Sequence, residues 1–192
     1  MRIQCISAIL MSFGASASLL AGTISVLPAT PTETAGQTFT LSVDISGAAD
    51  LYGYQFDLGF NPAVLEATGV TEGLFLPTGG PTIFLPGMID NVGGTITANA
   101  DILNGAVSGV NGSGDLLDVT FEALAAGSSN VQLFNLIALN SFGQGLVETT
   151  ASSTVTVLAP TGAAPEPGTG LLAAVAALGA LVLRRLLRPS SV

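Results

Sequence analysis

Three carboxylates lie close together in the sequence, at Asp115, Asp118 and Glu122. Glycoside hydrolysis needs only a pair of carboxyl groups, so this cluster is a candidate for catalysis. On a regular strand, Asp118 and Glu122 would share one face and Asp115 would lie on the other. Ordinary solvated carboxylates explain the same residues, and we favour that interpretation. We therefore expect no catalytic residue and no enzymatic activity, with a carboxylate-pair hydrolase as one alternative.

Two oxygen-rich segments, residues 111–115 and 101–105, raise the question of a bound metal. Calcium favours clustered carboxylate and carbonyl oxygens, and both segments contain Asp, Asn and Gly. Neither has the ligand spacing of an EF-hand loop. We interpret both as plain turns and expect no metal ligands and no cofactor, with structural calcium as the alternative.

Basic residues are confined to the two ends of the chain. The 192 residues include no His and only four Lys or Arg, namely Arg2, Arg184, Arg185 and Arg188. Thirteen residues are Asp or Glu, and all except Glu166 lie between residues 22 and 160. That body has neither His nor Lys nor Cys, which excludes Ser-His-Asp triads, Cys-His pairs, Schiff bases and imidazole metal sites. Without cations to neutralise phosphates, it is also not expected to bind nucleic acid.

The N-terminal segment resembles a secretory signal. Arg2 supplies the positive start, residues 3–13 form an apolar core that contains the lone Cys5, and residues 15–17 (Ala-Ser-Ala) form a small-x-small cleavage motif. The apolar core is short compared with the roughly 20 residues of a membrane-spanning helix. We therefore predict a removed signal peptide over residues 1–22, with cleavage at residues 15–17 or near Ala21 and Gly22, which implies export; a buried helix or a membrane anchor is the alternative.

The C-terminal segment combines three features in a fixed order. A linker over 160–167 ends in Pro165, Glu166 and Pro167, and an uncharged run rich in Gly, Ala, Leu and Val follows. Arg184 and Arg185 flank that run. Long basic side chains can reach the membrane interface, and the positive-inside rule places them in the cytoplasm. We predict a transmembrane sorting helix over 168–187 and a cytoplasmic basic tail over 188–192.

This tail resembles the PEP-CTERM sorting signal of bacteria that make exopolysaccharide. The resemblance implies recognition by an exosortase-like processing enzyme, with Pro165, Glu166, Pro167, Arg184 and Arg185 as the sorting motif. It implies a precursor anchored in the inner membrane and a mature form at the cell surface or secreted. A plain C-terminal membrane anchor is the alternative.

The body between residues 23 and 159 has a hydrophobic period of two. Apolar and polar residues alternate over 38–46 and again over 51–60, as expected for strands with one buried face. Glycine, proline and asparagine clusters separate the runs. We predict nine strands in a jelly-roll β-sandwich, over 23–28, 38–46, 51–60, 64–70, 82–89, 95–102, 114–124, 130–139 and 149–158.

Tyr52 and Tyr54 offer rings on which a sugar could stack. Their even-numbered positions match those of Phe56, Leu58 and Phe60, which form the apolar side of the same strand. We therefore expect both tyrosines to belong to the core. One helical turn is expected just after this strand, with Asn61 as its cap and Pro62 at its first position.

The body also resembles cohesin domains. The resemblance is strongest over 51–70, where an aromatic-rich strand runs into Asn-Pro-Ala-Val-Leu and ends at Val70, and it extends to 36–43 and 114–123. It implies a nine-strand jelly roll akin to some carbohydrate-binding modules, which binds dockerin domains through one sheet face. We expect an exported, non-enzymatic module for protein–protein or matrix adhesion, which binds an unknown surface protein or polysaccharide. A module that binds carbohydrate, such as exopolysaccharide, is the alternative.

Overall fold

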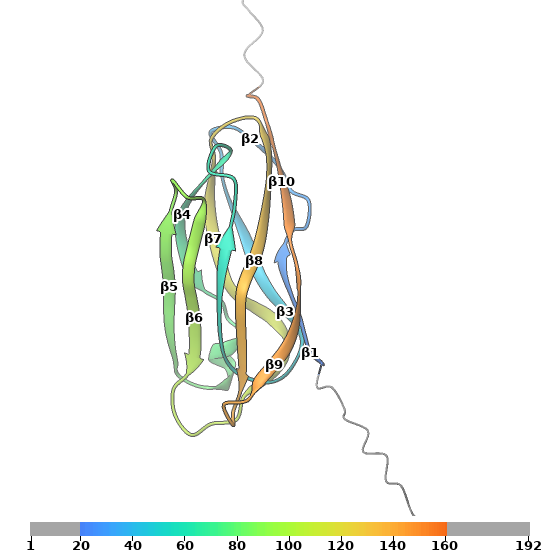
Figure 1. The fold of residues 1–192 in the computed structure, drawn as a ribbon, viewed down its shortest axis with the longest axis vertical. Coiled ribbons are helices and arrows are strands. Elements are labelled where there is room, and N and C mark those ends of the chain that lie inside the picture. Colours follow the sequence, from blue (N-terminus) through green and yellow to red (C-terminus); the bar gives the residue numbers. More distant parts are fainter. Residues whose placement is uncertain (1–19, 161–192) are drawn as a thin grey trace, which may run out of the picture. The chain divides into compact units, whose positions relative to one another are not determined.

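A computed structural model describes residues 20–160, and this part of the chain is almost entirely β-structure (Figure 1). The signal-peptide prediction apart from residues 20–22, and the predictions for the tail after Pro160, lie outside the described residues. The elements are β1 (Leu20–Leu27), β2 (Thr32–Thr34), β3 (Thr38–Gly59), β4 (Leu65–Glu72), the 3₁₀ helix η1 (Leu76–Gly79), β5 (Thr82–Asp90), β6 (Thr95–Leu103), β7 (Val110–Ala123), β8 (Gly127–Asn140), β9 (Gly145–Ala151) and β10 (Ser153–Leu158). No helix within 20–160 is long and apolar enough to span a membrane.

The long strand β3 belongs to both layers of a sandwich. Its first half pairs with β1 and β7, and β4 extends this layer beyond β7. Its second half pairs with β6 and β8, and β5 extends that layer beyond β6. Gly47 and Asp50, with φ of 76° and 60°, lie between the two halves. The chain therefore passes from one layer to the other within a single hydrogen-bonded strand.

One hydrophobic core fills the space between the layers. Leu41, Val43 and Ile45 on the first half of β3 are buried, and Phe56 and Leu58 on its second half are fully buried. This alternation is what a strand with one inward face requires. Phe121 of β7 packs edge-on against Phe60, with the ring centroids 5.3 Å apart. The expected all-β sandwich is thus confirmed.

The number of strands differs from the expected nine. Residues 20–160 contain ten. Residues 149–158 are divided at Ser152 into β9, which pairs with β1, and β10, which pairs with β8. The segments 38–46 and 51–60 are joined in β3, and the unpredicted β2 pairs in parallel with β10. β2 is only three residues long, so its sequence contains no period that could reveal it.

The turn expected after β3 is present. The side chain of Asn61 accepts a hydrogen bond from Ala63 N (3.1 Å), and its backbone carbonyl accepts from Val64 N and Leu65 N. This turn carries the chain from β3 to β4 and brings residues 61–62 next to the β5–β6 connection, where Phe60 N donates to Gly94 O (2.8 Å).

Strand β5 is the last strand at one end of the sheet order. Pro86 lies in the middle of β5, opposite Asn99 of β6, and Gly87 follows with φ of 77°. Proline is tolerated in a sheet mainly at an edge, because it has no N–H to give to a neighbouring strand. This position is therefore suited to the rim of the sheet.

Candidate interaction surface

The outer face of β5, β6, β3 and β8 exposes apolar side chains. On β6, Asp101 and Leu103 point inward and are buried, whereas Ile102 between them is 40% exposed. Ile83 of β5 lies opposite Ile102 and is 51% exposed. Strand geometry places alternate residues on opposite faces, so these isoleucines stand side by side on the outside.

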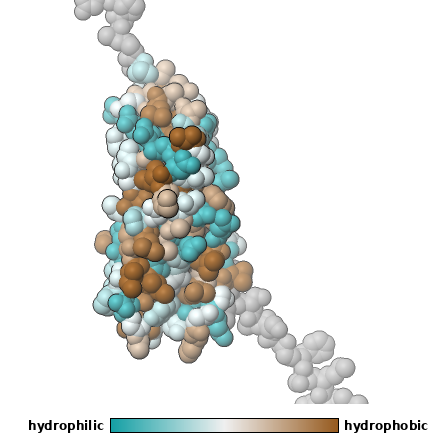
Figure 2. Space-filling view, turned by 60° about the vertical axis from the view of Figure 1, so that its left-hand side comes forward, coloured by the Kyte–Doolittle hydropathy of each residue, from teal (hydrophilic) through white to brown (hydrophobic). Residues whose placement is uncertain are grey.

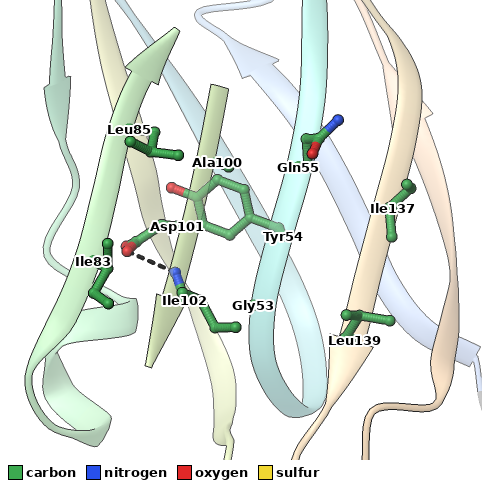
Figure 3. Close-up of a pocket in the computed structure, with 10 residues that line it drawn as sticks. All are labelled: Gly53, Tyr54, Gln55, Ile83, Leu85, Ala100, Asp101, Ile102, Ile137 and Leu139. Atoms are coloured by element: carbon green, nitrogen blue, oxygen red, sulfur yellow. Dashed lines mark hydrogen bonds between the residues drawn. The ribbon is translucent and has the colours of Figure 1, made fainter. Parts of the chain in front are cut away.

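Four residues form what we call the aliphatic patch: Ile83, Leu85, Ile102 and Ile137. Leu85 and Ile137 are more than half exposed, at 57% and 53%. A hollow of about 340 Å³ lies among them, with Gln55 and Leu139 also on its wall (Figure 3). Figure 2, with the β5 side of the molecule turned forward, shows hydrophobic side chains gathered between polar ones. Clustered exposed aliphatic groups of this kind are typical of a binding surface.

Gly53 of β3 keeps this hollow open. A Cβ at that position would lie 3.0 Å from Ile102 Cγ1 and 3.1 Å from the carbonyl oxygen of Asp101. Both distances are shorter than ordinary van der Waals contact. A larger residue at position 53 would therefore displace Ile102 and change the shape of the patch.

A second depression with a different character lies on the strands near Gly59. We call it the amide groove, and its polar wall consists of Asn61, Thr95, Ser128, Asn130 and Gln132. It measures about 460 Å³ and is lined by no charged side chain. The ring of Phe134 lies beside Gly59, where an added Cβ would meet Phe134 Cε1 at 3.4 Å. The groove thus combines neutral hydrogen-bonding groups with one half-buried aromatic ring.

Asp57 of β3 holds the neighbouring strands together. Its two carboxylate oxygens accept hydrogen bonds from Ala98 N on β6 and from Asn135 Nδ2 on β8, each at 2.7 Å. Both strands are irregular opposite Asp57, and Ala98 and Asn135 have φ of 59° and 51°. One carboxylate therefore stabilises two β-bulges at once.

Asp101 is the charged residue that lines the aliphatic hollow. Its side chain is 1% exposed, and its Oδ1 accepts a hydrogen bond from Ile102 N at 2.8 Å (Figure 3). Burial raises the pKa of this carboxyl group to about 7, and repulsion from Glu72 adds to the effect. A buried acid therefore lies on the inner side of β6, next to the exposed Ile102 of the aliphatic patch.

The predicted carboxylate cluster lies elsewhere, on β7, and its geometry corrects one expectation. Asp118 pairs with Ser42 and Asp115 pairs with Asp44, so Leu116 is an extra residue in the ladder. This bulge returns Asp115 to the same side as Asp118, contrary to the regular alternation that we had assumed. The Ser42 hydroxyl donates to Asp115 Oδ1 at 2.8 Å.

The environment of Asp115 is that of a half-buried structural acid. Burial raises its pKa, while the Ser42 hydrogen bond lowers it and the charges of Asp118 and Asp44 raise it further. Glu122 pairs with Thr38, four positions further along β7 from Asp118. The three predicted residues are therefore distributed along one strand beside β3.

The two oxygen-rich segments are mostly strand rather than turn. Residues 111–115 belong to β7, where Asn111 Oδ1 accepts from Asp50 N (3.0 Å) and Ser113 Oγ accepts from Gly47 N (3.0 Å). Residues 101–103 belong to β6. Our interpretation of both as plain turns was wrong, because most of their residues belong to strands, and Asn111 and Ser113 bind the backbone where β3 crosses between the layers. Within residues 20–160, no group of three or more acidic, His or Cys side chains could hold a metal ion.

The two tyrosines lie against the core. Tyr54 is 4% exposed, its ring stacks on Phe56 with centroids 5.4 Å apart, and its hydroxyl donates to Leu116 O at 2.7 Å. Tyr52 is half-buried against the core, and its hydroxyl donates to Gly105 O. The core assignment is confirmed for Tyr54, and neither ring is a free platform for a sugar.

Sequence reasoning missed the aliphatic patch. One signal was present: in β5, Ile83, Phe84 and Leu85 are consecutive apolar residues, without the polar alternation of the first half of β3. Consecutive apolar residues in an antiparallel strand indicate that both of its faces meet apolar surroundings. The predicted sorting-motif residues, from Pro165 to Arg185, lie outside the described residues.

Comparison with solved structures identifies the fold. A non-cellulosomal cohesin from the archaeon Archaeoglobus fulgidus is 18% identical, with a TM-score of 0.57 over 71% of this chain and 90% of that chain. A type I cohesin–dockerin complex from Clostridium thermocellum matches with 10% identity and a TM-score of 0.59, over 71% of this chain and 99% of that chain. The sixth cohesin of scaffoldin B from Acetivibrio cellulolyticus, in complex with a Cel5 dockerin, matches at 13% identity and a TM-score of 0.57, over 72% of this chain and 99% of that chain.

Comparison with family models covers nearly the whole sandwich. The model of the cohesin domain matches residues 24–157, from β1 to β10. Among curated protein sequences, none matches. The resemblance seen over 51–70 is therefore confirmed across the body, and the chain belongs to the cohesin domain family, whose members are non-catalytic interaction modules.

Proposed function

We propose that this cohesin domain is exported and binds a protein partner through the aliphatic patch. The observation that carries the proposal is the group of four exposed aliphatic side chains around one hollow, on strands fixed by the core. An apolar centre with a polar rim is the usual composition of a protein–protein interface. The carboxylates of the catalytic alternative lie on β7, in the other layer, and do not line this hollow.

A dockerin-like domain is the partner class that we propose. Solved cohesins with this fold are complexed with dockerins in C. thermocellum and A. cellulolyticus. The body of this chain has acidic residues and no Lys, Arg or His between residues 22 and 160. A partner with an apolar centre and basic rim residues would therefore gain affinity from burial and a faster encounter from charge.

Binding is tested by placing one carboxylate on each face of the sandwich. Ile137→Asp puts a charge into the aliphatic patch, and Thr40→Asp puts the same charge on an exposed position of the other layer. Isothermal titration calorimetry with a panel of purified dockerin domains is expected to detect binding by the wild type and by T40D. We expect I137D to lose at least about tenfold in affinity, since a charge buried without a partner costs more than 1.4 kcal/mol. Equal affinity of I137D and T40D would reject the patch, and no binding to any dockerin would reject the partner class.

Export and sorting are the second part of the proposal. Signal-peptide removal near residue 22 and processing near Pro165, Glu166 and Pro167 would leave the sandwich outside the cytoplasmic membrane. Intact-mass analysis of the protein recovered from the envelope and the medium reports both new ends. Replacing the three motif residues by Ala should keep the full C-terminus in the membrane fraction. If wild type and variant have the same mature mass, exosortase-like processing at this motif is rejected. If both also keep the full C-terminus, a plain membrane anchor is the remaining explanation.

Carbohydrate binding is a second candidate, favoured by the amide groove. Its hydroxyl and amide groups are neutral, and the Phe134 ring beside Gly59 offers an apolar surface to a sugar. A polysaccharide pull-down of wild type, Gln132→Ala and I137D separates the two functions. Retention that is lost in Q132A but kept in I137D would support glycan binding at the groove, and no retention of the wild type would remove this candidate.

A further inference from the structure

The buried side chain of Asp101 has one oxygen without a conventional donor. Oδ1 accepts the Ile102 N–H, but Oδ2 receives no N–H or hydroxyl group from the described residues. A buried acceptor without a partner costs free energy of folding, and an ionised one costs more. An ionised Asp101 is therefore unfavourable at this position.

Glu72, the last residue of β4, supplies the neighbouring group. It raises the pKa of Asp101 through its charge and through a side-chain hydrogen bond, and it contacts Thr82, which pairs with Leu103, two residues from Asp101 on the same inward face of β6. Glu72 Oε1 also accepts a hydrogen bond from the hydroxyl of Thr82, the first residue of β5. Two carboxylates have no hydrogen between them, so such a bond exists only when one of the two groups is protonated.

No basic side chain between residues 22 and 160 is available to neutralise this pair. The titratable groups near Asp101 are Glu72 on β4 and Tyr54 on β3, and Asp115 on β7 is a further acid near Tyr54. Burial and these acids raise the pKa of Tyr54, so its phenol stays neutral. Because residues 22–160 contain no Lys, Arg or His, no positive side chain of this body balances the negative charge of the two carboxylates.

We propose that Asp101 and Glu72 share one proton, and that loss of this proton loosens the start of β5 and with it the aliphatic patch. Thr82 and Asp101 point inward, and the next residues in each strand, Ile83 and Ile102, point outward and lie opposite each other. Repulsion between the two carboxylates separates β4 and β5 from β6, which moves Ile83 away from Ile102. The consequence for partner binding rests on the proposed function, but the structural change does not.

The pH range follows from the pKa of Asp101, which is raised from 3.8 to about 7. The unfolded chain releases this proton near pH 4 and the folded chain near pH 7, so stability falls as pH rises between these values and then levels off. In the folded protein, the Asp101 carboxyl group is protonated below about pH 7 and ionised above it. The start of β5 should therefore be ordered at pH 6 and loosened at pH 8.5.

Amide hydrogen exchange on the full chain in detergent micelles tests this without any partner. The probe is the exchange of β5, corrected for intrinsic rates, at pH 6 and pH 8.5 in wild type, Asp101→Asn and Glu122→Gln. The D101N side chain is neutral and can donate to Glu72 at every pH, whereas E122Q removes one negative charge at a distant site on β7. We expect β5 of wild type and E122Q to exchange about tenfold faster than β5 of D101N at pH 8.5, and equally at pH 6.

A carbon-13 carboxyl titration gives the second measurement, for the case that D101N folds poorly. In the wild type, the Asp101 resonance should titrate near pH 7, and Glu72→Gln should lower that midpoint by at least about one pH unit, because it removes the repelling charge. A midpoint near 4, or the same exchange of β5 in wild type and D101N at pH 8.5, would overturn the proposal. Protection restored at pH 8.5 by calcium chloride would also overturn it, in favour of a cation between the two carboxylates. Because neither readout involves a ligand, failure here is distinct from failure to bind a dockerin.

Discussion

The two outer faces of this sandwich are built on the same strand and differ in chemistry. On the first half of β3, the outward positions are Thr40, Ser42 and Asp44, and β7 adds Asp118 beside them. On the second half, the outward face is bordered by Ile102 of β6 and Ile137 of β8. Folding requires only that the inward residues be apolar, and both halves meet that requirement. The chemistry of the two outer faces is therefore not dictated by the core.

The largest loss of stability is expected from a substitution in the core, because both layers of the sandwich pack on it. Phe56→Ala removes a fully buried ring from the centre of the sandwich. Substitutions of this kind cost about 3–5 kcal/mol, through lost burial and the cavity left behind. Urea denaturation followed by far-UV circular dichroism measures the change. A loss below about 1 kcal/mol would mean that the layers are held together in some other way.

A smaller effect, restricted to the β6–β3–β8 layer, is expected for Asp57→Ala. It removes hydrogen bonds to Ala98 N and Asn135 Nδ2 and leaves a partly buried N–H without a partner. We expect a loss of about 2–4 kcal/mol in the same denaturation experiment. Asn135→Gly is the matched control, because it removes one of the two bonds and keeps a residue suited to positive φ. Equal losses for both variants would contradict the role of Asp57 as a link between two strands.

The polar face should have its own pH dependence through Asp115. Its pKa is raised from 3.8, mainly by burial, so the protonated form is favoured in the folded state. Stability contributed by that form is complete below pH 3.8 and is lost as pH rises through the folded pKa. Asp115→Asn stays neutral and keeps an oxygen to accept from Ser42, so its melting temperature should fall less than that of the wild type from pH 4 upward. Parallel melting curves for the two proteins would show that Asp115 is solvated like an ordinary acid.

The smallest effect on stability is expected from exchanging the character of the two faces. The double variant Ile137→Thr with Thr40→Ile changes two exposed positions and should alter the free energy of unfolding by no more than about 0.5 kcal/mol. Binding of any partner of the patch should nevertheless weaken. A stability loss above 1 kcal/mol would mean that Ile137 supports the fold, and the comparison between the faces would then lose its functional meaning.

Local patterns predicted the inward half of the structure well. Alternation over 38–46 and 51–60 identified buried residues such as Val43 and Phe56, since inward positions repeat with period two. The bulge at Leu116 was not predictable, because it depends on the pairing with Asp44 and not on the sequence around Asp115. Outward positions follow no such rule, so Ile102 and Ile137 became a patch only when the fold placed β6 and β8 on either side of β3.

The same limit explains Asp101 and Glu72. They are separated by 29 positions in sequence and lie on different strands, and only the turn of the chain through η1 and β5 brings their carboxyl groups together. The absence of cations from the body was visible at once, but its structural consequence was not. A buried carboxyl group without a basic neighbour is favoured in its protonated form, in which it can hydrogen-bond to a second carboxylate.

Pro86 in the middle of β5 has a bearing on how other molecules can approach. A regular outermost strand presents free N–H and C=O groups that an added strand can use, which is how sheets extend into fibres or accept extended peptides. Pro86 has no N–H, and the neighbouring Gly87 has a positive φ of 77°. Strand addition at this rim is therefore disfavoured, both for a second copy and for an extended peptide. At this rim, we therefore expect recognition through side chains on the face of the sheet rather than through backbone pairing.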